Sequence, residues 1–319
     1  MKLIFCGTPQ FAVPTLKHLL RAGHEVPLVV TQPDRPKGRG GELAAPPVKQ
    51  AAEKLGLAIT QPEKIKHNAE FRAQLEALAP RAIIVVGYGR IIPQWMIDLP
   101  PLGNLNVHAS LLPKYRGAAP IQWAIANGET TTGVTTMRID AGLDTGDILL
   151  QAATPIRASD TAVTFGPRLA ELGAALLIET LQRLDAGTLV ATPQNDAQSS
   201  QAPILTKNDG LIDWQRTAIE TWNRLRGFQP WPGAYTSFRG KSLQLTDARP
   251  MHESSTLQPG ELSAAGGKLV VGCGGASALE VLELQPEAKR KMTAADFING
   301  YRLAQPLERS TQPGERFGG

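Results

Sequence analysis

The side chains best suited to chemistry are Asn106 and His108, two residues apart at the end of a short apolar run. In a β-strand, residues i and i+2 project from the same face, so the amide and the imidazole would lie side by side. An amide can polarise a carbonyl group, and an imidazole can move a proton. Asp144, in the acidic loop 140–147, could bring a carboxylate to that imidazole. These residue types therefore suit acid–base chemistry on a carbonyl.

A histidine at the end of a strand is often a purely structural residue, and the residue types alone leave that alternative open. Residues 110–113, Ser-Leu-Leu-Pro, indicate a turn and not a continuing strand. The pair would then lie at the carboxyl edge of a sheet, where open α/β folds bind their ligands. This position favours a functional site without deciding it.

Other kinds of chemistry find less support. The five histidines show no His-x-His or His-Glu-x-x-His spacing, and the acidic loop lacks the calcium pattern, so we expect no metal. Ser110 lacks the glycine flanks of a Gly-x-Ser-x-Gly elbow, which argues against covalent catalysis by that serine. Gly7 is not followed by the further glycines of a dinucleotide-binding turn, which argues against a nicotinamide cofactor.

The strands that would position these residues are almost wholly apolar, as is typical of parallel sheets covered on both faces. Three runs have this character: residues 2–6, 26–30 and 82–86. Residues 11–20, between the first two, have helical spacing. Residues 132–139 alternate instead, which indicates an edge or antiparallel strand with one wet face, paired with residues 148–156. We therefore predict an α/β fold with a Rossmann-like, mostly parallel sheet.

A length of 319 residues suggests two domains. The polar residues 188–206 have the composition of a linker. Beyond them, five short runs with glycine turns predict a small β-barrel, of which the OB-like kind is one candidate. These runs are residues 234–238, 242–248, 260–262, 268–271 and 278–284. We assign the sheet domain to residues 1–187 and the OB-like barrel domain to residues 207–319, with a frayed tail from residue 309.

Positive charge is concentrated in the first third of the chain. The net charge is +4, but residues 1–120 carry 15 lysines and arginines against 8 acidic residues. The glycine-rich stretch 31–47 is longer than the ~2–6 residues usual for such a connection, and it carries Arg35, Lys37 and Arg39. Cations on a loop beside the carboxyl edge of a sheet suit contact with phosphates. A solvated loop whose charges only maintain solubility is the simpler alternative.

The two cysteines indicate the compartment. Cys6 and Cys273 are far apart and form no disulfide framework, so we expect buried thiols in a reducing environment. The apolar run at the N-terminus is too short for a signal peptide, and no run of about 18 apolar residues occurs. We therefore expect a cytoplasmic protein without a membrane span.

Several longer motifs resemble formyltransferases that use 10-formyltetrahydrofolate, and among these the enzymes that formylate methionyl-tRNA. The active-site part is Asn106-x-His108 with residues 110–113, followed by Asp144 in Gly-Leu-Asp-Thr-Gly-Asp. Further matches lie in both predicted domains: Gly7-Thr-Pro, residues 31–36, residues 112–122 and residues 224–234. No catalytic position departs from the family pattern, and the match is weakest from about Met251 onward.

The resemblance implies transfer of a formyl group from 10-formyltetrahydrofolate to the amino group of methionyl initiator tRNA. Asn106 and a protonated His108 would stabilise the oxyanion of the tetrahedral intermediate. Asp144 would orient the imidazole, favour its charged form and relay a proton through water. The resemblance also implies a folate site, with no metal, formed by Gly87, Tyr88, Arg90, Ile91, Ser110, Leu111, Leu112, Pro113 and Asp140.

The resemblance changes the interpretation of the basic stretch. Its cations, Arg35, Lys37 and Arg39, would contact the acceptor end of the initiator tRNA and would not be merely solvated charges. The OB-like domain, residues 207–319, would hold the tRNA backbone. We expect the protein to act as a monomer.

Two alternatives compete with this interpretation. A formyltransferase acting on a nucleotide sugar or on glycinamide ribonucleotide would share Asn106, His108 and Asp144, but it would not need both the loop 34–42 and the barrel domain. The second alternative is a non-catalytic RNA-binding module. The presence of all three candidate catalytic residues argues against it. The sequence therefore favours formylation of methionyl initiator tRNA for translation initiation.

Overall fold

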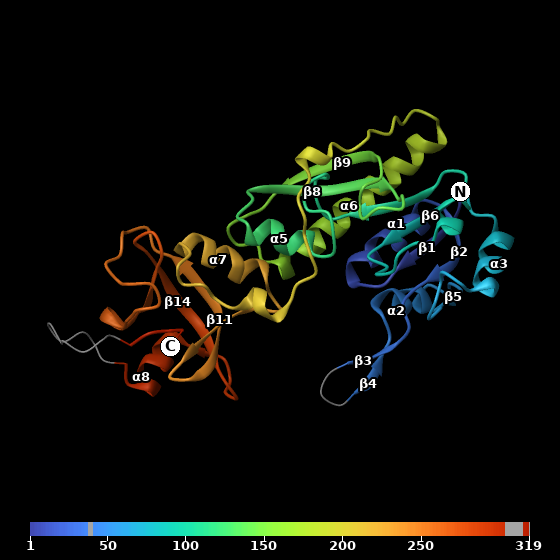
Figure 1. Ribbon diagram of the computed structural model, residues 1–319. Helices are drawn as coiled ribbons and strands as arrows, with labels where there is room; N and C mark the ends of the chain where they lie inside the picture. Colours follow the sequence, from blue (N-terminus) through green and yellow to red (C-terminus); the bar gives the residue numbers. More distant parts are fainter. Residues whose placement is uncertain (38–40, 304–314, 319) are drawn as a thin grey trace. The chain divides into compact units, whose positions relative to one another are not determined.

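The computed structural model describes residues 1–37, 41–303 and 315–318, which form two compact units (Figure 1). Unit 1 consists of Met1–Pro120, Thr131–Pro155 and Phe165–Pro203. Unit 2 consists of Ile121–Thr130, Ile156–Thr164 and Ile204–Gly319. Both units contain a β-sheet, but the two sheets differ in strand direction.

Unit 1 is built on a seven-stranded sheet in the order β5-β2-β1-β6-β7-β8-β9. Its strands are β1 (Lys2–Gly7), β2 (Glu25–Val30), β5 (Ile59–Thr60), β6 (Ala82–Val86), β7 (Asn104–His108), β8 (Thr131–Arg138) and β9 (Ile148–Pro155). The strands from β5 to β7 are parallel, whereas β8 is antiparallel to both β7 and β9. The predicted Rossmann-like, mostly parallel sheet is thereby confirmed.

Helices cover the sheet of unit 1 on both faces. They are α1 (Val13–Arg21), α2 (Pro47–Lys54), α3 (Ala69–Leu78), α4 (Gln94–Ile97) and α6 (Ala162–Asp185), the last of which begins in unit 2. Alternate residues of a strand point to opposite faces. Leu3 of β1 therefore packs in one core with Leu16 of α1, while its neighbour Ile4 packs in a second core with Phe71 of α3. Fully apolar strands are the consequence of this double covering.

Strand β8 is antiparallel, as expected, but the prediction of a wet face is wrong. It lies between β7 and β9, and its residues from Thr132 to Met137 are buried. The buried threonine hydroxyls are satisfied internally: Thr135 donates to the Ser110 carbonyl at 2.7 Å, and Thr136 bonds Thr180 at 2.8 Å. The alternation of polar and apolar residues in β8 therefore reflects threonines with internal hydrogen-bond partners and not a face exposed to solvent. The edge strand is β9, where exposure alternates along the strand.

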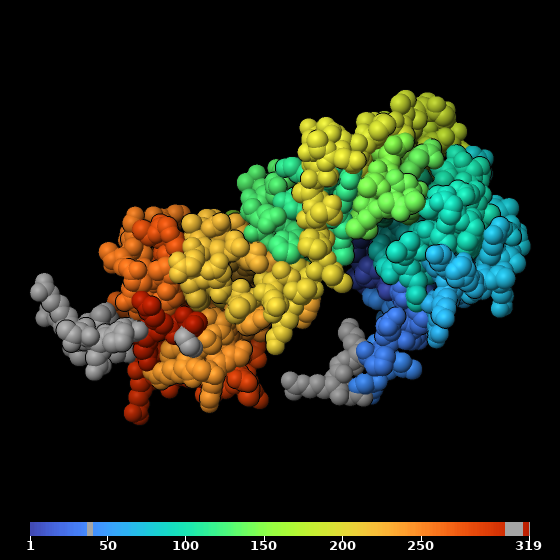
Figure 2. All heavy atoms as spheres, in the orientation of Figure 1, coloured from blue at the N-terminus to red at the C-terminus, as the bar shows by residue number. Residues whose placement is uncertain are grey.

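The basic stretch forms a hairpin. Strand β3 (Arg35–Lys37) pairs antiparallel with β4 (Glu42–Ala44), and Figures 1 and 2 show the hairpin projecting from the rest of unit 1. At its base, the Asp34 carboxylate accepts hydrogen bonds from Gln61 at 2.8 Å and Lys49 at 2.7 Å. These bonds lower the pKa of Asp34 below its usual value.

Unit 2 contains an antiparallel half-barrel in the order β10-β11-β14-β13-β12, with β15 paired to β14. Its strands are β10 (Ala234–Phe238), β11 (Lys241–Pro250), β12 (Leu262–Ser263), β13 (Leu269–Cys273), β14 (Ser277–Pro286) and β15 (Met292–Thr293). The unit also holds α7 (Ala218–Gly227), α8 (Ala294–Tyr301) and α5 (Pro120–Ala126), the last of which begins with the final residue of a unit 1 segment. The expected strands are present, whereas β15 and α8 were not expected.

The expectation of a frayed tail is wrong for residues 315–318; residues 309–314 and 319 lie outside the described chain. Phe317 is buried, and its ring packs against Trp214, Phe238 and Phe297. Its backbone N–H donates to the Gly260 carbonyl at 2.8 Å. The large apolar area of a buried aromatic ring explains why this end of the chain is held.

Candidate active site

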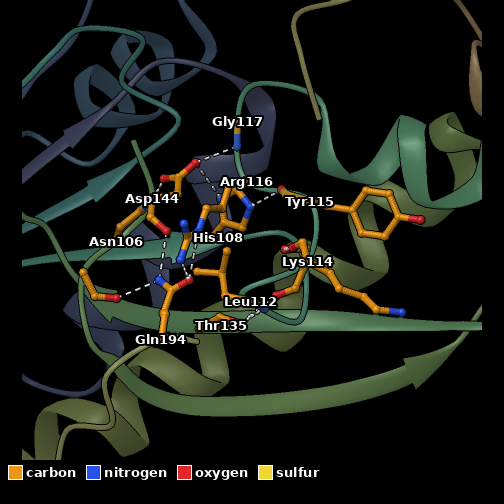
Figure 3. A network of polar contacts seen from close by, with 12 residues as sticks. Asn106, His108, Leu112, Lys114, Tyr115, Arg116, Gly117, Thr135, Asp144 and Gln194 are labelled. Atoms are coloured by element: carbon orange, nitrogen blue, oxygen red, sulfur yellow. Dashed lines mark hydrogen bonds and ion pairs between the residues drawn. The ribbon is translucent and has the colours of Figure 1, made fainter. Parts of the chain in front are cut away.

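Strand β7 and the loop after β8 bring Asn106, His108 and Asp144 together (Figure 3). Val107, between the first two, packs into the core that contains Leu177 of α6. The strand therefore turns Asn106 and His108 to the opposite face, where both approach Asp144. The Asn106 amide nitrogen lies 3.4 Å from Asp144 Oδ1, and His108 Nδ1 lies 3.6 Å from Asp144 Oδ2.

The Asp144 carboxylate is oriented by backbone. Its shortest contact is a hydrogen bond from the Gly117 N–H to Oδ2, at 2.8 Å. Asp144 itself has φ of 53°, a left-handed conformation that a non-glycine residue adopts only when its surroundings hold it there. Two residues on, a Cβ on Gly146 would lie 2.0 Å from the Arg138 carbonyl oxygen, so only glycine fits. The loop is thus packed tightly against the end of β8.

The two ring nitrogens of His108 have different partners. Nε2 lies 2.8 Å from the Tyr115 carbonyl oxygen, and a carbonyl only accepts, so Nε2 carries a hydrogen. Nδ1 faces the Asp144 carboxylate at a distance longer than a hydrogen bond. Nδ1 is therefore the nitrogen that can take up or release a proton. The buried ring thus lies between an oxygen atom on each side.

Asn106 retains hydrogen-bonding capacity. Its amide has two N–H groups, and its contact with Asp144, at 3.4 Å, is at the weak end of the range. The side chain is only half-buried. Asn106 therefore offers an N–H donor, and His108 an imidazole nitrogen, from one strand face beside a carboxylate. Such an arrangement can stabilise negative charge on an oxygen and move a proton nearby.

The turn after β7 is committed mainly to the fold. The Ser110 hydroxyl is buried and donates to the Lys114 carbonyl at 2.6 Å. The buried Leu112 binds through its backbone N–H to the Thr135 hydroxyl, at 3.1 Å. Leu111 and Pro113 are half-buried. Of the four residues expected here to contact a ligand, Leu111 and Pro113 are the ones with exposed surface to offer.

The loop after β6 contains four more of the expected ligand residues. Gly87 and Gly89 have positive φ, so the chain turns sharply around Tyr88, which is buried. The Tyr88 carbonyl accepts hydrogen bonds from Thr8 and Gln32, and burial raises the pKa of its phenol above the usual range. Arg90 is half-buried, and Ile91 is 91% exposed. The loop thus presents backbone and one bare apolar side chain.

The loop after β8 reaches the same edge of the sheet. Ile139 packs on the core that contains Tyr88 and Ile92, which brings the two loops together. Asp140 is exposed, and its carboxylate accepts a hydrogen bond from the Thr145 hydroxyl at 2.8 Å. The expected ligand residues on the two loops therefore line one edge of unit 1.

The three expected tRNA-binding cations can be placed only in part. Arg35 is exposed on β3. Lys37 ends that strand, and its side chain lies outside the described part of the chain. Arg39 lies wholly outside the described residues.

Two residues at the site were missed by the sequence reasoning. The Gln194 amide donates to the carbonyls of Asp144 and Gly146, at 2.8 and 2.7 Å. Its oxygen accepts two hydrogen bonds from Arg116. Arg116 lies in a motif that signalled the family, but Gln194 lies in a polar segment whose composition indicates only a linker. No local pattern could have identified it.

The two cysteines are not placed for chemistry. Both cysteines are free and buried, as expected. Burial raises the pKa of the Cys273 thiol to about 12 and that of Cys6 further, so both stay protonated near neutral pH. Among residues 1–37, 41–303 and 315–318, no three His, Cys, Asp or Glu side chains are grouped as a metal site requires. Over the same ranges, no helix is long and apolar enough to cross a membrane.

Comparison with known proteins identifies relatives along nearly the whole chain. Residues 1–181 match the formyl transferase family, and residues 204–302 match the formyl transferase C-terminal domain. The chain is 68% identical to a methionyl-tRNA formyltransferase of Koribacter versatilis (strain Ellin345), over 95% of this chain and 96% of that protein. Identity to the methionyl-tRNA formyltransferase of Acidobacterium capsulatum is 60%, over 95% and 98%.

A solved structure resembles this one in fold. It is an N-formyltransferase from Helicobacter canadensis in complex with folinic acid and dTDP-3-aminofucose. The TM-score is 0.66 at 20% identity, over 90% of this chain and 99% of that one.

Proposed function

The chain belongs to the formyl transferase family, and we infer that it transfers the formyl group of 10-formyltetrahydrofolate to the amino group of methionyl initiator tRNA. Relatives named methionyl-tRNA formyltransferase share 60% and 68% identity over 95% of the chain. Their similarity extends through both matched regions. The product, formylmethionyl-tRNA, would serve translation initiation.

The observation that carries the proposal is the meeting of Asn106, His108 and Asp144 at the carboxyl edge of the sheet. When the methionyl amine attacks the formyl carbon, the formyl oxygen becomes negatively charged. Asn106 donates an N–H to this oxygen, and a protonated His108 lies beside it. Donors of this kind contribute about 3–4 kcal/mol each in other enzymes.

Proton transfer completes the reaction. The attacking amine must lose a proton, and the leaving N10 must gain one. Asp144, with its carboxylate held by the Gly117 N–H, accepts the first proton directly or through water. His108 Nδ1, 3.6 Å from the same carboxylate, exchanges protons with it and supplies the second.

The folate would bind on the two loops beside this cluster. Backbone of residues 87–92 and 140–144 would contact the pterin, and the exposed Ile91 would cover it. Leu111 and Pro113 would form the adjoining wall. A flat apolar ring with polar edges suits a surface made of backbone groups and a few apolar side chains.

Two basic surfaces would contact tRNA. The first is the basic stretch 31–47, whose sequence carries Arg35, Lys37 and Arg39. The second is in unit 2, where a cavity of about 220 Å³ is lined by the cations Arg239, Lys241 and Lys289 and by one acidic residue, Glu287. Lys289 also lies over the Tyr301 ring, at 4.9 Å. Local clusters of this kind suit phosphate contacts even where the domain is nearly neutral.

Formyl transfer to a nucleotide sugar is the second candidate, because the Helicobacter canadensis protein was solved with such a ligand. At 20% identity, that likeness supports the fold only. The relatives that are 60% and 68% identical to this chain are named methionyl-tRNA formyltransferase. The nucleotide-sugar activity is therefore the weaker proposal.

The decisive experiment supplies 10-formyltetrahydrofolate with each acceptor in turn: methionyl initiator tRNA, a nucleotide amino sugar and glycinamide ribonucleotide. We expect formylation of the tRNA only. A folded protein that leaves methionyl-tRNA unmodified would contradict the proposal. Sedimentation of the active protein would test whether it acts as a monomer.

The hairpin assignment has its own test. Arg39→Ala should raise KM for tRNA and leave folate binding unchanged, because the side chain would contact only the acceptor end. An equal loss of folate binding would show that the assignment is wrong.

A further inference from the structure

Asp144 and Tyr115 supply the oxygen atoms on the two sides of the His108 ring, and the backbone of both residues is hydrogen-bonded to one stretch of chain, residues 194–202. We propose that Gln194, supported by Ser200, is a positioning residue that fixes the Asp144 carboxylate and the Tyr115 carbonyl on the two sides of the imidazole. This inference deepens the proposed function and rests on it for the kinetic test only.

On the Asp144 side, Gln194 holds the loop by its backbone. The two hydrogens of its amide serve two carbonyls, those of Asp144 at 2.8 Å and Gly146 at 2.7 Å. Asp144 is the residue with left-handed φ in this loop. A conformation of that kind costs about 1–3 kcal/mol and persists only when neighbouring groups hold it. Gln194 bonds the carbonyl of that very residue.

Arg116 fixes which way the Gln194 amide points. Its Nε and Nη2 donate to Gln194 Oε1 at 3.0 and 2.8 Å. The reverse orientation would set the amide hydrogens against the guanidinium and the oxygen against two carbonyls. Arg116 is buried, and its charge is balanced by Asp196 at 2.8 Å. The Gln194 donors are therefore directed at the loop by a charge-assisted hydrogen bond.

On the Tyr115 side, the same segment holds the other acceptor. The Ser200 hydroxyl accepts the Tyr115 N–H at 2.9 Å, and the Ser200 carbonyl accepts the Arg116 N–H at 2.8 Å. Tyr115 also has a left-handed φ, 62°. A Cβ on Gly117 would lie 2.6 Å from the Ala202 carbonyl oxygen. The segment therefore packs directly on the peptide whose N–H binds Asp144.

These contacts predict a specific kinetic effect. Without the Gln194 donors, the Asp144 loop can relax from its left-handed conformation and carry the carboxylate away from His108. A misplacement near 1 Å can cost about 10²-fold in rate. The same loop supplies residues 140–144 of the proposed folate surface, whereas the basic stretch expected to contact tRNA lies on a different loop, residues 31–47. The loss should therefore fall on kcat and on KM for the folate, and leave KM for tRNA nearly unchanged.

The test compares Gln194→Ala and Gln194→Glu in formylation of methionyl initiator tRNA. We expect kcat to fall about 10- to 100-fold in both, because glutamate keeps the acceptor for Arg116 but loses the donors to the loop. In an Asp144→Ala background, Gln194→Ala should cause no further loss, since it acts through Asp144. An equal further loss in that background would indicate a general structural role and overturn the proposal.

Asn195→Ala is the matched control. Asn195 is exposed in the same segment, and its side chain accepts a hydrogen bond from the nearby Ala197 N–H, at 3.1 Å. Its loss should leave kcat unchanged. A fall equal to that of Gln194→Ala would show that any disturbance of the segment suffices, and the assignment to Gln194 would be wrong.

Amide hydrogen exchange tests the positioning without any activity. Gln194→Ala should speed exchange in residues 140–147 and at Gly117, whose N–H donates to Asp144, relative to Asn195→Ala. Unchanged exchange would overturn the proposal. If the wild-type protein fails to formylate methionyl-tRNA, the proposed function falls, and the exchange result still decides the role of Gln194.

Discussion

Each unit contains a cluster of polar side chains around one charged residue, Asp144 in unit 1 and Arg226 in unit 2. The two clusters differ in how many of the hydrogen bonds of that residue are already formed within the protein. In unit 1, the Asp144 carboxylate makes one short bond, from Gly117, and leaves longer contacts of 3.4 and 3.6 Å to Asn106 and His108. In unit 2, Arg226 donates from Nη1 to the carbonyls of residues 157, 158 and 160 and from Nη2 to Asn223. The first cluster keeps bonding capacity, and the second uses the capacity of both terminal nitrogens.

The surroundings of Arg226 are those of a structural residue. Its guanidinium lies 4.0 Å from the centroid of the Trp222 ring. Burial lowers its pKa, an effect that the charge of Asp160 partly opposes. Arginine nevertheless remains charged at neutral pH. The side chain therefore joins the 157–160 turn to α7 within unit 2.

This difference in hydrogen bonding distinguishes a cluster that can act on a substrate from one that stabilises the fold. The shortest bonds of Arg226 reach the Asp160 carbonyl at 2.8 Å and the Asn223 side-chain oxygen at 2.6 Å, and terminal nitrogens committed in this way stabilise the fold and are not available to a substrate. Loose contacts at 3.4–3.6 Å, held in place by short backbone bonds, leave groups available for a transition state. Substitutions in the Asp144 cluster should therefore lower kcat, and substitutions in the Arg226 cluster should lower the free energy of unfolding.

The largest effect is expected from His108→Ala and Asp144→Ala. Each should lower kcat about 10²- to 10³-fold, because charge stabilisation or proton transfer is lost at the reacting atoms. Single-turnover formylation measures the rate, and filter binding measures the affinity for tRNA, which should change little. A large loss of affinity would reassign these residues to binding.

Arg226→Met should give the converse result. Removing the guanidinium leaves three carbonyls and the Asn223 amide without their donor, which should lower the free energy of unfolding by about 3 kcal/mol. Urea unfolding measures the loss, and kcat of the folded enzyme should stay near that of wild type. The exposed Arg216→Met is the control. A large fall in kcat with an unchanged free energy of unfolding would show that Arg226 does not have the structural role assigned to it.

The smallest effect is a pH dependence at the start of α7. Hydrogen bonds from the Thr217 hydroxyl and backbone N–H lower the pKa of Glu220. A folded pKa below the unfolded value adds stability above the unfolded pKa, and this is lost as pH falls through the folded one. Glu220→Gln should therefore cost roughly 0.5 kcal/mol at pH 7, as expected for an exposed cap.

Unfolding of wild type and Glu220→Gln at pH 7 and pH 3 measures this effect. The difference between the two proteins should shrink at the lower pH. A difference that grows on acidification would contradict the sign of the pKa shift.

The sequence alone determined the features that repeat with the chain's own periodicity. Apolar strands predicted the parallel sheet, and the two-residue spacing placed Asn106 and His108 on one face, where the structure brings Asp144 to them. These features follow from backbone geometry, which assigns each residue to a face whatever its distant neighbours.

Only the tertiary structure decided which polar groups have partners. The wet face expected for β8 became buried because Thr135 and Thr136 find acceptors and donors in distant segments. Phe317 packs against Phe238 in a core that the local sequence pattern did not predict. Gln194 meets Asp144 from 50 residues away. Hydrogen bonds and ring contacts of this range leave no trace in local composition, because they depend on where the fold returns the chain.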